Sequence, residues 1–168
     1  IAARAGVSKQ TVYAHFGSKE ALFGAIIEER CERFLALNLP EDLDSGDLEK
    51  NLRAVARAFM VEVLAESSLS LHRLIVGESA RFPEIGRAAY DAGPARALAR
   101  LARLLAAHGP RNGFEFGNGE QAAEQFYAIV LGLLQLRAIL HNDAASEEAR
   151  MAGWIEDAVS TFLAGHRQ

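Results

Sequence analysis

The stretch that decides the fold lies at the start of the chain, where residues 1–23 read IAARAGVSKQTVYAHFGSKEALF. Its spacing predicts a short helix over 1–5, a tight turn at Gly6–Val7 and a second helix over 9–16, for which Ser8 is a suitable N-cap. Glycine supplies the backbone freedom that a turn between two steeply crossed helices requires. The stretch therefore predicts a helix-turn-helix.

The helix expected over 9–16 has two different faces. Val12 and Phe16 are four residues apart and can join a small core. Tyr13 can offer its hydroxyl to a phosphate, and Lys19 can add positive charge beside the free amides of the next helix. The other side chains are short or carry hydrogen-bond donors that fit a major groove, namely Lys9, Gln10, Thr11, Ala14 and His15.

Charge is distributed unevenly along the chain. The net charge of the 168 residues is −4, which taken alone argues against binding to nucleic acid. Residues 1–19, however, hold three basic groups and no acid, while residues 20–168 hold the other fifteen basic groups against all 22 acids. The basic start is therefore the part that suits a polyanion, and the acidic remainder has a different partner.

The first 23 residues closely resemble the DNA-binding signature of the TetR family of transcriptional regulators. The resemblance rests on the Ala-Gly-Val-Ser turn at 5–8, the Tyr13 and Phe16 pair, and the Ser-Lys-Glu-Ala-Leu sequence at 18–22. It implies an all-helical homodimer that reads a palindromic operator in double-stranded DNA and binds a small molecule in a larger C-terminal domain. Gln10 and Thr11 become the best candidates for base contact in an operator-facing set of Lys9, Gln10, Thr11, Tyr13, His15 and Lys19. The family's first helix would precede Ile1, so we expect the DNA-binding domain of this chain to be incomplete at its N-terminus.

The rest of the chain is also predicted to be helical. Ala, Leu, Arg and Glu recur at spacings of three and four, without the alternation of β-strands. Helices are expected over 19–37, 47–66, 69–80, 84–92, 94–108, 119–141 and 147–165. We expect two domains, a helix-turn-helix domain with its connecting helix over 1–38 and a ligand-binding and dimerisation domain over 45–168. A looser resemblance to one branch of the TetR family supports this, through FPEIGR at 82–87, YDAGP at 90–94 and EQFYAIVLGLLQLR at 124–137.

Apolar stripes run along the middle helices. Such stripes most often form packed core, and it is the family resemblance that implies a ligand cavity among them. The candidate ligand-binding residues are Phe59, Val63, His72, Ile75, Tyr90, Phe126, Tyr127 and Val130. The helices expected over 119–141 and 147–165 carry more apolar surface than one side requires, which indicates either a dimer interface or deep burial in the monomer. The candidate interface residues are Leu133, Leu136, Leu140, Trp154, Ile155, Ala158 and Phe162.

Several other classes are disfavoured. The single Cys31 excludes an intrachain disulfide framework and a multi-cysteine zinc site, and it suits a reducing, cytoplasmic location. No apolar stretch approaches the roughly 20 residues that span a bilayer. The sequence contains no nucleophile elbow, phosphate loop, zinc-protease motif or dinucleotide fingerprint, so we expect no enzyme activity, cofactor, metal or membrane partner.

The sequence thus predicts a ligand-responsive transcriptional regulator, a repressor released from its operator by a small, largely apolar effector. Two alternatives remain open: a DNA-binding regulator without a small-molecule effector, and a helical protein-interaction adaptor. A body packed to normal core density would favour the first, and convergent polar groups in a cleft would favour the second.

Overall fold

The computed structural model describes residues 2–3, 5–38, 46–141 and 144–167. Within these ranges the chain forms helices and no β-strand, with a single isolated bridge between Phe114 and Arg167. The helices are α1 (Lys9–Phe16), α2 (Lys19–Asn38), α3 (Leu48–Leu64), α4 (Glu66–Ser79), α5 (Pro83–Ala92), α6 (Pro94–His108), the 3-10 helix η1 (Pro110–Asn112), α7 (Gly119–Leu131), α8 (Leu134–His141) and α9 (Ala144–Ala164). The all-α prediction is confirmed.

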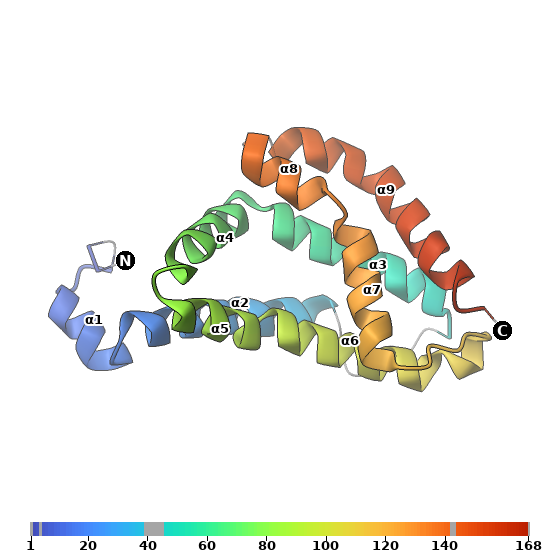
Figure 1. The fold of residues 1–168 in the computed structure, drawn as a ribbon, viewed down its shortest axis with the longest axis horizontal. Coiled ribbons are helices and arrows are strands. Elements are labelled where there is room, and N and C mark those ends of the chain that lie inside the picture. Colours follow the sequence, from blue (N-terminus) through green and yellow to red (C-terminus); the bar gives the residue numbers. More distant parts are fainter. Residues whose placement is uncertain (1, 4, 39–45, 142–143, 168) are drawn as a thin grey trace.

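Helices α2 to α9 form one body, from which the short helix α1 projects (Figure 1). The long helix α2 runs beside α5 and α6 along one edge, and α8 and α9 lie along the opposite edge. Helix α1 stands at one end, away from the body, and the C-terminus lies at the other end. The helix-turn-helix region is therefore presented at one end of an elongated helical body.

The N-terminal segment differs from the prediction. Among its described residues, 2, 3, 5 and 6 form turns, in which the amide of Gly6 donates to Ala3 and the amide of Val7 donates to Ala2. The helix predicted over 1–5 is therefore wrong at the described positions. These two hydrogen bonds are of the kind that closes the C-terminal end of a helix, and the described residues complete no helical turn of their own. Gly6 does adopt the positive φ, +67°, that the turn was expected to need.

The helix predicted over 119–141 is also wrong, because it is interrupted at Gly132. Gly132 has a φ of 48° and a ψ of −131°, and α7 and α8 are inclined by 46°. A Cβ at this position would lie 2.5 Å from Cζ2 of Trp154, whose indole Nε1 donates to the carbonyl of Val130 at 2.8 Å. The indole of α9 therefore occupies the space that a side chain at residue 132 would need, and it uses the carbonyl that the amide of residue 134 would bond in a continuous helix.

The core lies where α3, α6, α7 and α9 meet. Its fully buried side chains include Leu52, Met60, Leu101, Leu105, Phe126, Val130, Ile155, Val159 and Phe162. Near the C-terminus, Phe116 stacks on Phe162 with ring centroids 5.6 Å apart, and the ring of His166 lies 5.0 Å from Phe116. Burial of this apolar surface is the main favourable term in folding of the body.

Helix α2 is held against the body between Lys19 and Glu32. Phe23 and Ile27 are buried, and three ion-pair groups connect the helix to its neighbours. Lys19 contacts Glu78 of α4, Arg30 contacts Glu62 of α3, and Arg96 of α6 contacts both Glu28 and Glu32. A change in the body that alters these contacts therefore also affects the position of α2, the helix that follows α1.

None of the described helices is by itself long and apolar enough to cross a bilayer. Only α7 and α8 counted together, with the bend of 46° between them, reach the required length and composition.

Candidate nucleic-acid interface and effector cavity

Helix α1 carries most of the predicted DNA-binding residues on the surface. Ser8 caps it as expected, because its Oγ accepts from the amide of Thr11 at 3.0 Å and lies 2.8 Å from the Thr11 hydroxyl. All residues of α1 are exposed or partly exposed, and the Tyr13 side chain is 53% exposed. The structure places on this surface Lys9, Gln10, Thr11, Tyr13 and His15.

Lys19, the sixth predicted DNA-binding residue, lies in the first turn of α2 and faces the body. Its ammonium is 2.7 Å from Oε2 of Glu78, and it lies 5.8 Å from the ring centroid of Phe23 and 5.7 Å from that of Phe82. Its side chain is still 42% exposed. Contact between Lys19 and DNA therefore remains a prediction, and it would compete with a contact inside the protein.

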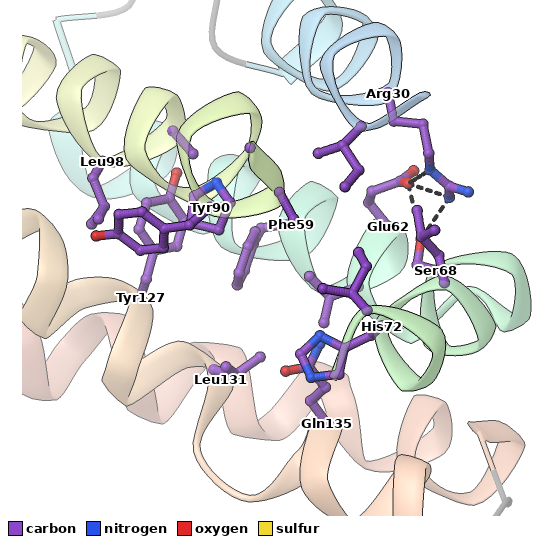
Figure 2. A pocket seen from close by; sticks show the side chains of 18 of the residues that line it. Arg30, Phe59, Glu62, Ser68, His72, Tyr90, Leu98, Tyr127, Leu131 and Gln135 are labelled. Atoms are coloured by element: carbon purple, nitrogen blue, oxygen red, sulfur yellow. Dashed lines mark hydrogen bonds and ion pairs between the residues drawn. The ribbon is translucent and has the colours of Figure 1, made fainter. Parts of the chain in front are cut away.

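A cavity of about 630 Å³ opens among α2 to α8. Volumes of roughly 300–1,000 Å³ are typical of small-molecule sites. Figure 2 shows the aromatic rings of Phe59, Tyr90 and Tyr127 on one side of it, with Leu98 and Leu131 nearby. The ring centroids of Phe59 and Tyr127 are 4.6 Å apart, and Tyr90 is 52% exposed. The cavity is thus mainly apolar, and one of its wall residues, Tyr90, is also exposed at the surface.

Six of the eight predicted ligand-binding residues line this cavity, namely Phe59, Val63, His72, Ile75, Tyr90 and Tyr127. The other two, Phe126 and Val130, are fully buried in the core and do not line it. Phe126 and Tyr127 are adjacent in sequence, so they point to different sides of α7. On α7 the sequence analysis thus named one residue that lines the cavity, Tyr127, and two that belong to the core.

A polar cluster forms one end of the cavity, and the sequence analysis did not predict it. Arg30 of α2 donates from Nη2 to Oε1 of Glu62 at 2.6 Å and to the hydroxyl of Ser68 at 2.6 Å. Ser68 in turn donates to the same Glu62 oxygen at 3.0 Å (Figure 2). Arg30 and Glu62 are 32 residues apart in sequence, and no local spacing connects them.

His72 is a titratable residue of the cavity wall that is partly buried. Partial burial lowers the pKa of its imidazole below the usual 6.5, because desolvation disfavours the charged form. The ring is therefore neutral near pH 7. A neutral imidazole can both donate and accept a hydrogen bond, which suits a polar group on an otherwise apolar ligand.

The predicted dimer residues fall into two groups. Leu133, Leu136, Leu140 and Trp154 are between 40% and 69% exposed and lie at the α7–α8 break, on α8 and on α9. The structure places the others in the core of the monomer, where Ile155, Ala158 and Phe162 are at most 4% exposed. The unpartnered apolar surface is thus narrower than the sequence suggested.

An exposed helix that follows a glycine turn, joined by a long helix to a body with an apolar cavity, defines a DNA-binding transcriptional regulator. Comparison with family models agrees: residues 1–26 match the model described as bacterial regulatory proteins, tetR family, and residues 50–168 match that of the AefR-like transcriptional repressor, C-terminal domain. The chain belongs to the TetR family. Accordingly it is a regulator and not an enzyme.

Two solved structures extend the similarity over nearly the whole chain. One is a crystal structure at 1.54 Å resolution of a protein from Mesorhizobium loti MAFF303099 assigned to the TetR family, with 29% identity and a TM-score of 0.84. The other is the flavonoid-responsive regulator FrrA, with 36% identity and a TM-score of 0.78. Each match covers 99% of this chain and 84% of the other. None of the curated proteins matches the chain. Regulators of this family bind operator DNA and form dimers, and some bind small-molecule effectors.

Proposed function

We propose that this protein is a repressor that leaves a palindromic operator when a small, largely apolar effector enters the cavity of the body. In this proposal residues 1–38 form the DNA-binding domain with its connecting helix, and residues 45–168 form the effector-binding and dimerisation domain. The operator lies in the cytoplasm, where we expect the protein to act.

One observation carries the proposal: α2 lines the cavity and also directly follows α1, the helix that we propose contacts DNA. Ile27 and Arg30 of α2 line the cavity, and only two residues, Gly17 and Ser18, separate this helix from the end of α1. A ligand that contacts these residues changes the forces on α2 and hence the position of α1. An effector that favours the released state by about 3 kcal/mol would weaken operator binding more than 100-fold, a typical allosteric coupling.

The cavity favours an aromatic effector. Its walls hold the rings of Phe59, Tyr90 and Tyr127, which offer flat apolar surfaces, while polar groups stand at its edges. FrrA, which is 36% identical, is described as flavonoid-responsive. We therefore propose a planar, hydroxylated aromatic compound of flavonoid size as the effector class.

We propose that two copies of the chain dimerise through an exposed apolar surface, in which each residue packs against the same surface of the second copy. This surface consists of Leu133, Leu136, Leu140 and Trp154. A two-fold axis through this surface would make a self-complementary interface. It would also present two α1 helices to successive major grooves, roughly 34 Å apart, as a palindromic operator requires. Each half-site alone would bind weakly.

Fluorescence anisotropy on a duplex from the region upstream of the gene tests the proposal, using protein that includes the helix expected before Ile1. We expect tight binding at moderate salt and release on addition of a hydroxyflavone. Binding that no aromatic compound weakens would contradict the effector mechanism and favour a regulator without a small-molecule effector.

A further inference from the structure

The ion pair at the polar end of the cavity is only partly satisfied by its neighbours. The contacts of Arg30 come from Nε, 3.2 Å from Oε1 of Glu62, and from Nη2, which reaches Glu62, Ser67 and Ser68. Both Glu62 contacts to Arg30 and the contact from Ser68 use the same oxygen, Oε1. Among the described residues, no hydrogen bond reaches Nη1 of Arg30 or Oε2 of Glu62.

The pair therefore keeps a donor group, Nη1, and an acceptor atom, Oε2, without a partner among the described residues, and both side chains line the cavity. The side chains of Arg30 and Glu62 are 23% and 36% exposed, so they are partly shielded from water. A hydroxyl group matches this arrangement, because it accepts one hydrogen bond and donates another. Hydrogen bonds to charged groups are stronger than those between neutral groups, which makes the match selective.

Charge decides between the possible ligand groups. The guanidinium and the carboxylate neutralise one another, and their closest contact is 2.6 Å. A ligand carboxylate would be repelled by Glu62, and a ligand amine would be repelled by Arg30. An uncharged hydroxyl meets neither penalty.

We propose that Arg30 and Glu62 form the specificity subsite for an aromatic hydroxyl of the effector, and that Arg30 transmits its occupation to α2. This inference rests on the proposed function and adds the ligand group and the residue that senses it. A hydroxyl that accepts from Nη1 of Arg30 and donates to Oε2 of Glu62 adds a ligand bridge beside the contacts that join α2 to Glu62 of α3 and to Ser67 and Ser68 of α4. The bound ligand then changes how α2 is held against α3 at Arg30, about one helical turn after the buried Ile27.

A second arginine provides the matched control. Arg96 of α6 also pairs with carboxylates of α2, at Glu28 and Glu32, but it does not line the cavity. Substitution of Arg96 by Met therefore removes a fastening of α2 of the same kind without touching the proposed subsite. Any effect specific to Arg30→Met reports the subsite rather than the loss of an ion pair.

Calorimetric titration with flavone and with a monohydroxyflavone tests the subsite. We expect the wild type to bind the hydroxylated probe roughly tenfold more tightly, as one charge-assisted hydrogen bond predicts. The preference should fall to about one in Arg30→Met and persist in Arg96→Met. Equal affinities in the wild type, or a preference that survives in Arg30→Met, would overturn the subsite while leaving the effector cavity intact. Failure of both flavones to bind the wild type would overturn the proposed aromatic effector and the subsite together.

The variant Glu62→Gln is expected to gain affinity for a charged ligand, which an unfolded variant could not do. Loss of the negative charge should let a flavone carboxylate bind at least roughly fivefold more tightly than it binds the wild type, because Arg30 is then no longer neutralised. In operator anisotropy, the hydroxyflavone should release DNA from the wild type and from Arg96→Met, but at least roughly tenfold less effectively from Arg30→Met. No gain for the carboxylate, or unchanged release in Arg30→Met, would contradict the assignment.

Discussion

The ammonium of Lys19 lies 2.7 Å from the carboxylate of Glu78, which joins the first turn of α2 to the last turn of α4. It is the first ion pair between the body and the chain that follows α1. The rings of Phe23 and Phe82 flank the ammonium at 5.8 and 5.7 Å. A lysine predicted to contact DNA is thus bound to the helical body.

Release of this lysine should strengthen operator binding. In Glu78→Gln the ammonium becomes free to approach a phosphate, so we expect severalfold tighter DNA binding and a salt dependence steeper by about one ion. The stability should change by less than about 1 kcal/mol, because the pair is partly exposed. Anisotropy over a salt series and thermal melting measure the two effects. Unchanged salt dependence would remove Lys19 from the DNA-binding set.

The exposed residues of α1 should separate into two kinds of DNA contact. Gln10→Ala should cost about 1–3 kcal/mol and relax the base preference at one operator position, as expected for a base contact. Lys9→Ala should weaken binding to all sequences alike and lower the salt dependence by about one ion. Lys50→Ala, at an exposed lysine of α3, serves as the control. Equal loss on all sequences for Gln10→Ala would exclude base readout by this residue.

The break between α7 and α8 should tolerate no side chain at residue 132. Gly132→Ala combines an unfavourable positive φ with a Cβ only 2.5 Å from the Trp154 ring, so we expect a loss of about 2 kcal/mol or more in unfolding free energy. Gly77→Ala in α4, where nothing lies within 4 Å of the new Cβ, should instead stabilise by about 0.5–1 kcal/mol. Chemical denaturation measures both. A neutral Gly132→Ala would mean that the helix can continue through this position.

The exposed apolar surface of α8 should determine the oligomeric state. The double variant Leu136→Glu and Leu140→Glu places two carboxylates in the proposed interface, and we expect monomers by light scattering with operator affinity reduced at least roughly tenfold. Val76→Glu, a similar change at a valine of α4 that is 58% exposed, should leave the dimer intact. A dimer that survives the double variant would place the interface elsewhere.

Effector binding should weaken on acidification because of His72. Burial lowers the pKa of its imidazole, so the folded protein favours the neutral ring. This preference has no effect well above pH 6.5, and stability is lost as the pH falls through that ordinary value towards the lower folded pKa. An apolar effector that buries the ring further should bind more weakly at about pH 5.5 than at about pH 7.5. In His72→Gln this part of the pH dependence should vanish, and its persistence would assign it to another group.

Local interactions allowed several elements to be predicted from the sequence. The predicted cap at Ser8 is confirmed, since its hydroxyl accepts from the amide of Thr11 at 3.0 Å. Ser18 caps α2 in the same way, by accepting from the amide of Ala21 at 3.1 Å. Helix α1 has the predicted bounds, and the family resemblance carried by residues 1–23 is confirmed by the family models. Each of these features depends on residues within a few positions of one another.

The sequence by itself determined the helical class, the turn at Gly6–Val7 and helix α1, because capping, glycine conformation and helical periodicity act within a few residues. Only the tertiary structure decided where α7 ends, which aromatic side chains face the cavity rather than the core, and that Arg30 joins Glu62. Trp154 is 22 residues from Gly132, and Glu62 is 32 residues from Arg30. Contacts over such separations exist only after the helices have packed, and so no local pattern encodes them.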